Sequence, residues 1–290
     1  MALALFISFS ILNIADLSTD GCYTLGFAVG AVVTLSGHPI LAIPAAMAAG
    51  ACAGFCTAFL QTRLGVESIL AGIIVNTGLY TVNLAVMGWS SNLSIFGSDS
   101  LFTLFRSWSD SEFWRNWHKV ILPMLVLLLV CLLVALFFRT RLGLSIRATG
   151  DNAEMVRASS INPAFTVTVG LCLSNSLTAL GGCLYGLLNK ACDINLGTGM
   201  VTVALASLVI GESLIGKGSI PRRICGVVVG AVLYRVIVAF AIGANIPPEG
   251  FKLVSALIVA IAIAAPQGRK LIALKRQKAA AYRKEAGNHA

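Results

Sequence analysis

Long apolar runs separated by short polar linkers make up most of this 290-residue chain. Several runs approach about 20 residues without a charge, the length needed to cross a hydrocarbon core of roughly 30 Å. They are continuous rather than alternating, which favours helices over a barrel of strands. The apolar segments fall at about residues 1–14, 24–36, 40–60, 66–88, 120–138, 164–189, 200–216, 224–242 and 251–265. The pattern predicts an all-α polytopic membrane protein with about eight to ten transmembrane or half-spanning helices in a single domain, residues 1–265.

Composition supports a membrane location: 57% of the residues are hydrophobic and 11% are charged. Soluble domains are about one quarter charged. The net charge of +9 alone would suggest nucleic-acid binding, but the basic residues gather in alternate linkers, where membrane topology places them. We therefore expect a lipid bilayer as a partner and no nucleic acid. The eight cysteines lie mostly inside apolar runs, and we expect small buried hydrophobes rather than a disulfide framework or a metal site.

Charge in the linkers alternates between basic and acidic or aromatic. Basic residues lie near residue 63, in 139–157, in 217–223 and in the tail, 266–290. Cytoplasmic loops carry an excess of lysine and arginine, so we expect these linkers and the C-terminus in the cytoplasm and the 89–119 linker outside. The first apolar run has no basic leader and is too short to span. We expect a half-helix there, or a chain that begins upstream.

The external 89–119 linker contains the string "SDSEFWRNWHK". It predicts a short helix at the membrane interface, with Trp108, Trp114 and Trp117 in the aromatic belt. A contact surface for an outside partner is an equally good interpretation.

Pairs of small residues four positions apart recur along the chain. They are Gly26/Gly30, Gly50/Gly54, Gly182/Gly186 and Gly226/Gly230. Such pairs let helix backbones approach closely in lipid, so we expect tight helix packing at each. Their spread over both halves indicates internal duplication, and the short segments 24–36 and 200–216 are typical of broken helices that line a pathway.

Polar side chains within the apolar runs have two interpretations. Amides in a span either hold helices together, at up to about 1–2 kcal/mol each, or line a translocation path. The path candidates are Asn76, Asn83, Ser174 and Asn175. The intramembrane charges are Glu212 and Arg235, with Asp16 and Asp20 at the first break. We expect Arg235 to pair with Glu212 or with a neighbouring helix end, because an unpaired charge near mid-membrane is costly.

Enzyme chemistry is not expected of this chain. It has no Walker lysine loop, catalytic-triad spacing or metal-ligand cluster, and its three histidines lie in loops or the tail. Buried carboxylates, which proton-coupled transport uses, are scarce. We therefore expect no catalytic residue, metal or cofactor in this chain, and any energy for transport must come from another subunit.

The string "RATGDNAEMVRASSINPAF", residues 147–165, is charged yet lies between two of the most apolar runs. Asp151 or Asn152 can cap a helix whose first turn carries Glu154, since helix N-termini favour negative charge. Pro163 then resets the chain before the next span. One interpretation is an ordinary basic loop. The other is a short rigid helix that docks in a groove of a cytoplasmic motor subunit.

Residues 141–165, "RLGLSIRATGDNAEMVRASSINPAF", resemble the cytoplasmic coupling segment of permease subunits of bacterial ABC importers, the class that includes the ribose and branched-chain amino-acid permeases. That family carries the pattern A-x-G-x-N-x-x-A-A-x-x-x-G-I. This chain keeps Ala148, Gly150, Asn152 and Ile161, and departs from the pattern at the Ala-Ala pair and at Ser160, where the family has Gly. The strings "IADLSTDGCYTLGFAVGA", "SLVIGESLIGKGSI" and "PPEGFKLVSALIVAIAIAAP" also resemble the family, in order along nearly the whole chain. The likeness is closest to the branch proposed to import tryptophan or tyrosine.

The resemblance implies a permease subunit of an ATP-driven importer in the bacterial plasma membrane, forming the path of a small solute, with an aromatic amino acid favoured. Such permeases act as dimers, here expected to be homodimers, with a cytoplasmic ABC ATPase subunit that binds ATP and Mg²⁺ and an extracytoplasmic substrate-binding protein. The residues expected to couple the 139–163 segment to the ATPase are Arg147, Gly150, Asp151, Asn152, Met155 and Arg157. A secondary transporter of a small solute and a non-transporting membrane scaffold subunit are the rival interpretations.

Overall fold

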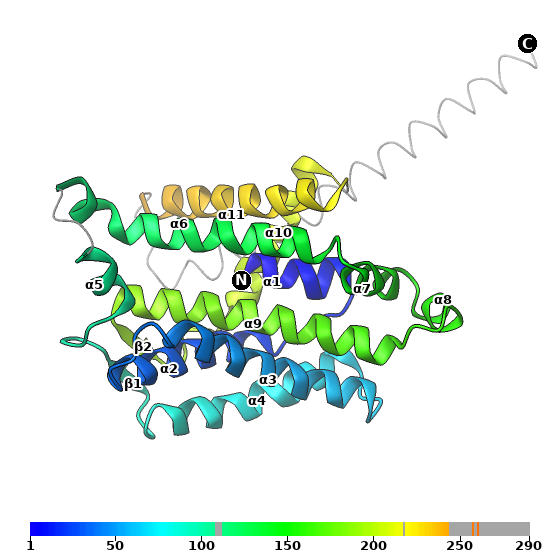
Figure 1. The fold of residues 1–290 in the computed structure, drawn as a ribbon, viewed down its shortest axis with the longest axis horizontal. Coiled ribbons are helices and arrows are strands. Elements are labelled where there is room, and N and C mark those ends of the chain that lie inside the picture. Colours follow the sequence, from blue (N-terminus) through cyan, green and yellow to red (C-terminus); the bar gives the residue numbers. More distant parts are fainter. Residues whose placement is uncertain (108–111, 217, 244–256, 258–259, 261–290) are drawn as a thin grey trace, which may run out of the picture. The chain divides into compact units, whose positions relative to one another are not determined.

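The computed structural model describes residues 1–107, 112–216, 218–243, 257 and 260, and helices dominate it (Figure 1). The elements are α1 (Ala2–Leu5), the π-helix η1 (Phe6–Ile11), α2 (Thr19–Leu35), α3 (Ala42–Thr62), α4 (Ser68–Val86), β1 (Asn92–Ser94), α5 (Leu101–Arg106), α6 (Glu112–Phe137), α7 (Arg141–Asp151), α8 (Ala153–Ala158), α9 (Pro163–Asn189), β2 (Ala191–Asp193), α10 (Met200–Ile215) and α11 (Ile220–Gly243). In the described residues, α3, α4, α6, α9 and α11 are long and apolar enough to cross a membrane. Three shorter apolar helices accompany them: Ala2–Ile11, Thr19–Leu35 and Met200–Ile215. The expected all-α polytopic fold is confirmed.

The chain divides into two compact units, Met1–Ala204 and Leu205–Ala290. A single domain over residues 1–265 stays a prediction, as does the internal duplication. In the first unit α9 packs against α2 and α3, and α4 packs on α2. The paired strands β1 and β2 and α5 lie at one end of this unit, the strand end, and α7 and α8 lie at the other, the α8 end (Figure 1). The 89–119 and 139–163 linkers are therefore on opposite ends, as their charge pattern predicts.

Small residues bring α2 and α3 into backbone contact with α9. A Cβ atom at Gly26 would overlap the carbonyl oxygen of Ala179, and one at Gly182 would overlap that of Tyr23. Each predicted pair contacts a neighbouring helix: Gly26/Gly30 and Gly182/Gly186 between α2 and α9, Gly50/Gly54 between α3 and α9, and Gly226/Gly230 between α11 and α10 within the second unit. Helices in lipid associate mainly through such van der Waals contact. The prediction of tight packing at these pairs is confirmed.

Two three-residue strands complete the strand end. They pair antiparallel in the register Asn92↔Asp193, Leu93↔Cys192 and Ser94↔Ala191. Lys190, in the left-handed conformation with φ of 56°, ends α9 and turns the chain into β2. Strands this short show no readable alternation, so the hydrophobic pattern did not predict them.

The separate interfacial helix expected at residues 109–119 is not present in that form. From Glu112 onward the chain belongs to α6, and the short separate helix is α5. The Trp114 indole nitrogen donates to the Phe105 carbonyl oxygen at 2.8 Å, and the two rings lie 4.8 Å apart. This aromatic contact joins α5 to the first turns of α6. Trp117 is exposed beside it, and Trp108 lies outside the described residues.

Cysteine burial differs from the expectation. Cys22, Cys183 and Cys192 are buried, whereas Cys52, Cys56 and Cys225 are exposed on their helices and Cys131 and Cys172 are half-buried. An apolar run in a membrane protein has a lipid-facing side as well as a core side, so membership of a run does not imply burial. Cys192 lies in β2, outside the spans, where burial raises the pKa of its thiol to about 12.

We expect Gly182→Ala to destabilise the first unit by about 1–3 kcal/mol, because the added methyl group has no space against the Tyr23 carbonyl oxygen. Gly78→Ala on α4 is the matched control, since a Cβ there meets nothing within 4 Å. Alanine is also the better helix former by up to about 1 kcal/mol. Thermal unfolding of the detergent-solubilised protein measures both. Equal melting temperatures for the two variants would contradict the packing assigned to α9.

Candidate functional site

The α7–α8 segment is a capped helix pair at the α8 end. Asn152 has an extended backbone (φ −160°), and its side-chain oxygen accepts hydrogen bonds from the backbone N–H groups of Glu154 at 3.0 Å and Met155 at 3.1 Å. Of the two capping residues proposed from the sequence, Asn152 therefore caps α8. Asn162 caps α9 in the same way, accepting from the Ala164 N–H at 3.0 Å, with Pro163 as the first helical residue. A loop interpretation of this segment is excluded.

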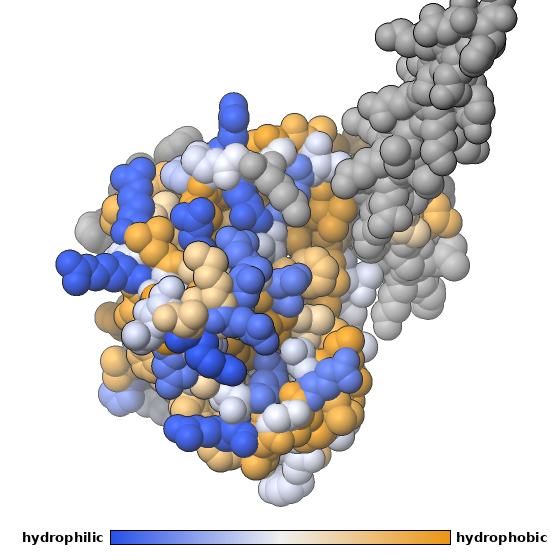
Figure 2. Space-filling view, turned by 90° about the vertical axis from the view of Figure 1, so that its right-hand side faces the viewer, coloured by the Kyte–Doolittle hydropathy of each residue, from blue (hydrophilic) through white to orange (hydrophobic). Residues whose placement is uncertain are grey.

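The surface of α8 is almost entirely exposed. Val156 is its one buried residue, and Met155 is 69% exposed. Arg147, Asp151, Asn152 and Arg157 of the expected coupling set are exposed as well. Figure 2 views this end of the molecule, where hydrophilic side chains gather. The segment thus offers a polar surface with one flexible apolar side chain.

Gly150 differs from the rest of the coupling set because it faces the protein. A Cβ atom there would overlap the carbonyl oxygen of Ile11, at the end of η1. The neighbouring Thr149 hydroxyl lies 2.7 Å from the Thr166 hydroxyl of α9, in a buried hydrogen bond. The end of α7 is therefore packed against both the N-terminal helix and α9.

A buried polar cluster holds the break between η1 and α2. Asp16 is 2% exposed and accepts hydrogen bonds from the Ser18 N–H at 2.9 Å, the Ser18 hydroxyl at 2.6 Å and the Asn175 amide at 2.8 Å. The Thr57 hydroxyl donates to the Ser18 oxygen at 3.2 Å. Within the described residues Asp16 has no ion-pair partner, so neutral donors alone solvate its carboxylate.

Asp20 lies where two helices begin. It occupies the first turn of α2, and its carboxylate accepts hydrogen bonds from the backbone N–H groups of Gly199 at 3.0 Å and Val201 at 2.8 Å, at the start of α10. The Gly197 N–H also donates to the Thr24 hydroxyl at 3.2 Å. Helix N-termini carry partial positive charge, so this carboxylate is stabilised by two of them.

Asn76 and Asn83 of α4 both bind the backbone of Gly21. The Asn76 side-chain oxygen accepts from the Gly21 N–H at 2.7 Å, and the Asn83 amide donates to the Gly21 carbonyl oxygen at 3.0 Å. Both residues also line a cavity of about 150 Å³. The cavity is lined by Asp20, Gly21, Thr24, Asn76, Thr77, Tyr80, Asn83, Ile194, Asn195 and Thr198.

The four predicted path residues separate into two places. Asn76 and Asn83 line the cavity, whereas Ser174 and Asn175 are fully buried. The Ser174 hydroxyl donates to the Ala4 carbonyl oxygen at 2.8 Å, and Asn175 holds Asp16. The sequence analysis missed Thr77 and Tyr80 of the cavity. Tyr80 lies four residues after Asn76, a spacing that puts both on one helix face and was available as a signal.

The intramembrane charge pair is not the one expected. Glu212 forms its ion pair with Arg223, at 2.8 Å, within the second unit. Arg235 is exposed on α11 and makes no ion pair in the described residues. Arg223 lies in the first turn of α11, the next helix along the chain, so it reaches Glu212, whereas Arg235 lies more than three turns further along α11 and does not.

Comparison with known proteins identifies the family of the chain. Residues 1–263 match the family model described as the permease component of branched-chain amino acid transport systems. The chain is 30% identical over 280 residues to the tyrosine transport system permease protein of Clostridioides difficile strain R20291, which covers 96% of this chain and 90% of the relative. A nucleoside ABC transporter permease protein of Lactococcus lactis is 24% identical over 230 residues, 73% of this chain and 60% of its own length.

A fructose import permease protein of Bifidobacterium longum is 28% identical over 159 residues, 53% of this chain and 44% of its own length. No solved structure matches the chain significantly. The family match covers nearly all the described residues, including the broken helices and the α7–α8 segment. The chain is therefore a multi-pass membrane protein that belongs to the ABC transporter permease family of branched-chain amino acid transport systems.

Proposed function

We propose that this chain is the transmembrane permease subunit of an ATP-driven importer of amino acids, with an aromatic amino acid as the favoured substrate. The family match and the relative named as a tyrosine permease support this substrate class. The more distant relatives are named for a nucleoside and a sugar. The proposed importer takes its solute from an extracytoplasmic substrate-binding protein and works as a homodimer of this chain.

The exposed, capped α8 is the observation that carries the proposal. A six-residue helix fixed by Asn152 and by Val156 can transmit force, whereas a loop would absorb it. Met155 supplies a flexible apolar contact, and Arg157 supplies a positive charge. We propose that this surface docks in a groove of a cytoplasmic ABC ATPase subunit. That partner, rather than this chain, binds ATP and Mg²⁺.

Movement of α8 reaches the membrane interior through packed backbone. α8 continues from α7, and Gly150 brings the end of α7 against Ile11. Five residues after Ile11 the chain reaches Asp16, whose hydrogen bond to Asn175 ties the break to α9. In the proposed mechanism, Asp16 and Asn175 hold the break between η1 and α2 in place against α9 while the α8 end moves.

The cavity at α4 is the proposed part of the translocation path. Polar groups at membrane depth face protein or water rather than lipid, yet Tyr80 is 52% exposed in the single chain. The Asn83 side-chain oxygen is buried and has no hydrogen-bond partner in the described residues. We propose that Asp20, Asn76, Thr77 and Tyr80 line this path, and that a second copy of the chain closes it.

Arg157→Glu is expected to lower substrate-stimulated ATPase activity of the reconstituted complex at least about tenfold, because breaking a buried interfacial charge contact costs about 2–5 kcal/mol. Membrane insertion should be unchanged, since Arg157 is exposed. Arg63→Glu makes the same charge change at an exposed position beyond the end of α3 and serves as the control. The assay uses tyrosine and tryptophan with the binding protein present. Normal coupling in Arg157→Glu, or uptake without ATP, would count against the proposal.

Asp16→Asn and Asn175→Asp should each lower the melting temperature and the uptake rate. The first places an amide opposite the Asn175 amide, and the second places two carboxylates in contact. A lost charged hydrogen bond of this kind costs about 1.5–3 kcal/mol. The double variant restores one donor and one acceptor, so we expect it to regain part of the melting temperature. A double variant as unstable as the sum of its singles would refute this role for the pair.

Tyr80→Cys should react with a membrane-impermeant thiol reagent, and reaction should slow when substrate is transported. Val82→Cys is the control: it is 47% exposed at nearly the same depth, but about 200° around α4 from Tyr80. Both are tested in a chain whose exposed native cysteines are replaced by alanine. Labelling of Val82→Cys instead of Tyr80→Cys would place the water-filled face on the other side of α4.

A further inference from the structure

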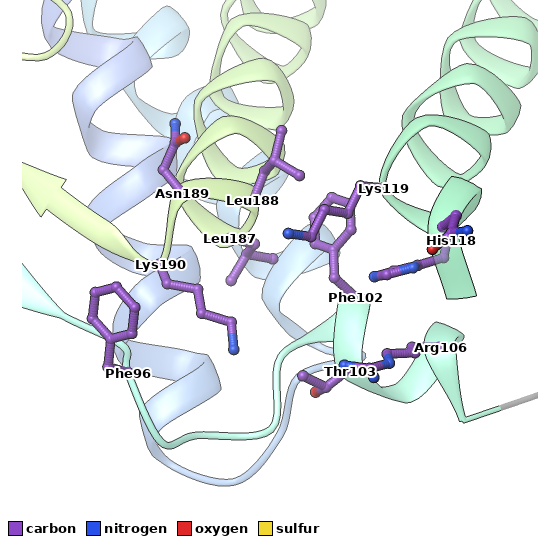
Figure 3. A pocket seen from close by; sticks show the side chains of 11 residues that line it. Phe96, Phe102, Thr103, Arg106, His118, Lys119, Leu187, Leu188, Asn189 and Lys190 are labelled. Atoms are coloured by element: carbon purple, nitrogen blue, oxygen red, sulfur yellow. The ribbon is translucent and has the colours of Figure 1, made fainter. Parts of the chain in front are cut away.

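A cationic cavity lies at the strand end, away from the α4 cavity and from α8. Its volume is about 510 Å³, and α5, α6 and the end of α9 surround it. Figure 3 shows the amino groups of Lys119 and Lys190 and the guanidinium group of Arg106 on three sides of it. No residue that lines it carries a carboxylate, within the described part of the chain. None of these three cations makes an ion pair there either.

Three cations that surround one space, without an ion pair in the described residues, favour the binding of an anion. Like charges that share one space repel one another, and a bound anion offsets this repulsion because it attracts each of them. Arginine and lysine are the side chains that recognise phosphate. The cavity therefore has the donors for a phosphate or phosphodiester group.

Part of the cavity wall is apolar, and Thr103, Asn116, His118 and Asn189 supply its other polar side chains. In the apolar part Phe102 is 4% exposed and Leu187 is 1% exposed, Leu188 is half-buried and Phe96 is 73% exposed. A free inorganic anion gains nothing from the apolar part of the wall, because these side chains offer it no hydrogen bonds. A ligand with both a phosphate and an apolar part satisfies both sets of residues.

The position along the membrane also matches such a ligand. The span in α6 covers Asn116–Phe137, so Lys119 lies near its first residue, and Lys190 directly follows the span in α9. Trp114 and Trp117, residues of the kind that anchor at the lipid headgroup level, precede Lys119 in α6. The cationic cavity is thus at headgroup height.

An apolar groove of about 550 Å³ runs along the same two helices. α6, α9 and α3 line it, with Val126, Leu129, Leu177 and Leu180 among its residues. From Lys119 to Leu129 along α6 is about 15 Å at roughly 1.5 Å per residue, half of the roughly 30 Å hydrocarbon core. A chain that starts at the cationic cavity and follows α6 through one leaflet therefore ends in this groove.

We propose that the protein binds an anionic phospholipid of the outer leaflet at this place. Its phosphate is held by Arg106, Lys119 and Lys190, and one acyl chain occupies the groove between α6 and the α3–α9 pair. The bound lipid would fill the space between α6 and the helices packed on α9. This site does not depend on the transported substrate or on the ATPase.

The test uses the full-length chain in nanodiscs of dioleoylphosphatidylcholine, with or without one tenth dioleoylphosphatidylglycerol, and with inorganic phosphate as a separate arm. We expect phosphatidylglycerol to raise the melting temperature and to co-purify with the chain by mass spectrometry. Lys119→Gln/Lys190→Gln should weaken its binding at least about tenfold, since the variant removes two of the three charged donors to the phosphate. Arg63→Gln/Arg222→Gln, which removes two exposed charges elsewhere, should leave lipid binding unchanged.

A groove variant separates lipid from phosphate. Leu129→Trp fills the groove without touching the cations, whereas Leu128→Trp changes a neighbouring exposed residue that does not line it. We expect Leu129→Trp alone of the two to reduce phosphatidylglycerol binding. Should the lysine double variant fold poorly, Arg106→Gln tests the headgroup contact alone.

Three results would overturn the proposal. The first is phosphatidylglycerol binding that the cation variants leave unchanged. The second is an equal rise in melting temperature with inorganic phosphate, which would make the cavity a simple anion site. The third is loss of binding to the external substrate-binding protein, with no lipid effect, in the lysine double variant, which would make the cavity a protein docking surface.

Discussion

Backbone contact between α2 and α9 sets the geometry on which the other parts of the first unit depend. The contact repeats every four residues: the Cys22 thiol donates to the Asn175 carbonyl oxygen at 3.2 Å, and Gly26 meets Ala179 one turn later. In lipid the hydrophobic effect adds little between helices, so shape at these small residues fixes the register. That register is what brings the start of α2, with Asp16, to the middle of α9.

The two broken helices then create charge sites that neither helix could form alone. A half-spanning helix exposes its N-terminal N–H groups inside the protein, where each unpaired group is costly. Asp20 accepts two such hydrogen bonds from the start of α10, and Ser18 supplies donors to Asp16 ahead of α2. The carboxylates and the helix breaks thus stabilise one another, which explains acidic residues in a span that has no described cation nearby.

Features encoded within a few neighbouring residues could be predicted from the sequence, and features that join distant segments could not. The glycine pairs, the Asn152 cap and the short helices at Thr19–Leu35 and Met200–Ile215 follow from local spacing and residue type. The pairing of β1 with β2, the choice of Arg223 rather than Arg235 for Glu212, and the Asp16–Asn175 bond require partners far apart in the chain or a known turn. An apolar run also hides which of its faces meets lipid, as Cys52 and Cys56 show.

In the coupling role that we propose for α7 and α8, Gly150 explains why such a segment needs small residues on its inner side as well as charges on its outer side. Arg157 and Met155 are exposed and can contact a partner. Their movement reaches the membrane helices only if α7 is packed tightly against them. At Gly150 the α7 backbone contacts the end of η1 directly, with no side chain between them. Interfaces of packed backbone shift as rigid bodies, whereas long side chains would absorb small displacements through rotamer changes. The same absence of a side chain that lets helices pack in lipid thus also makes the α7–η1 contact stiff enough to carry a displacement toward Asp16.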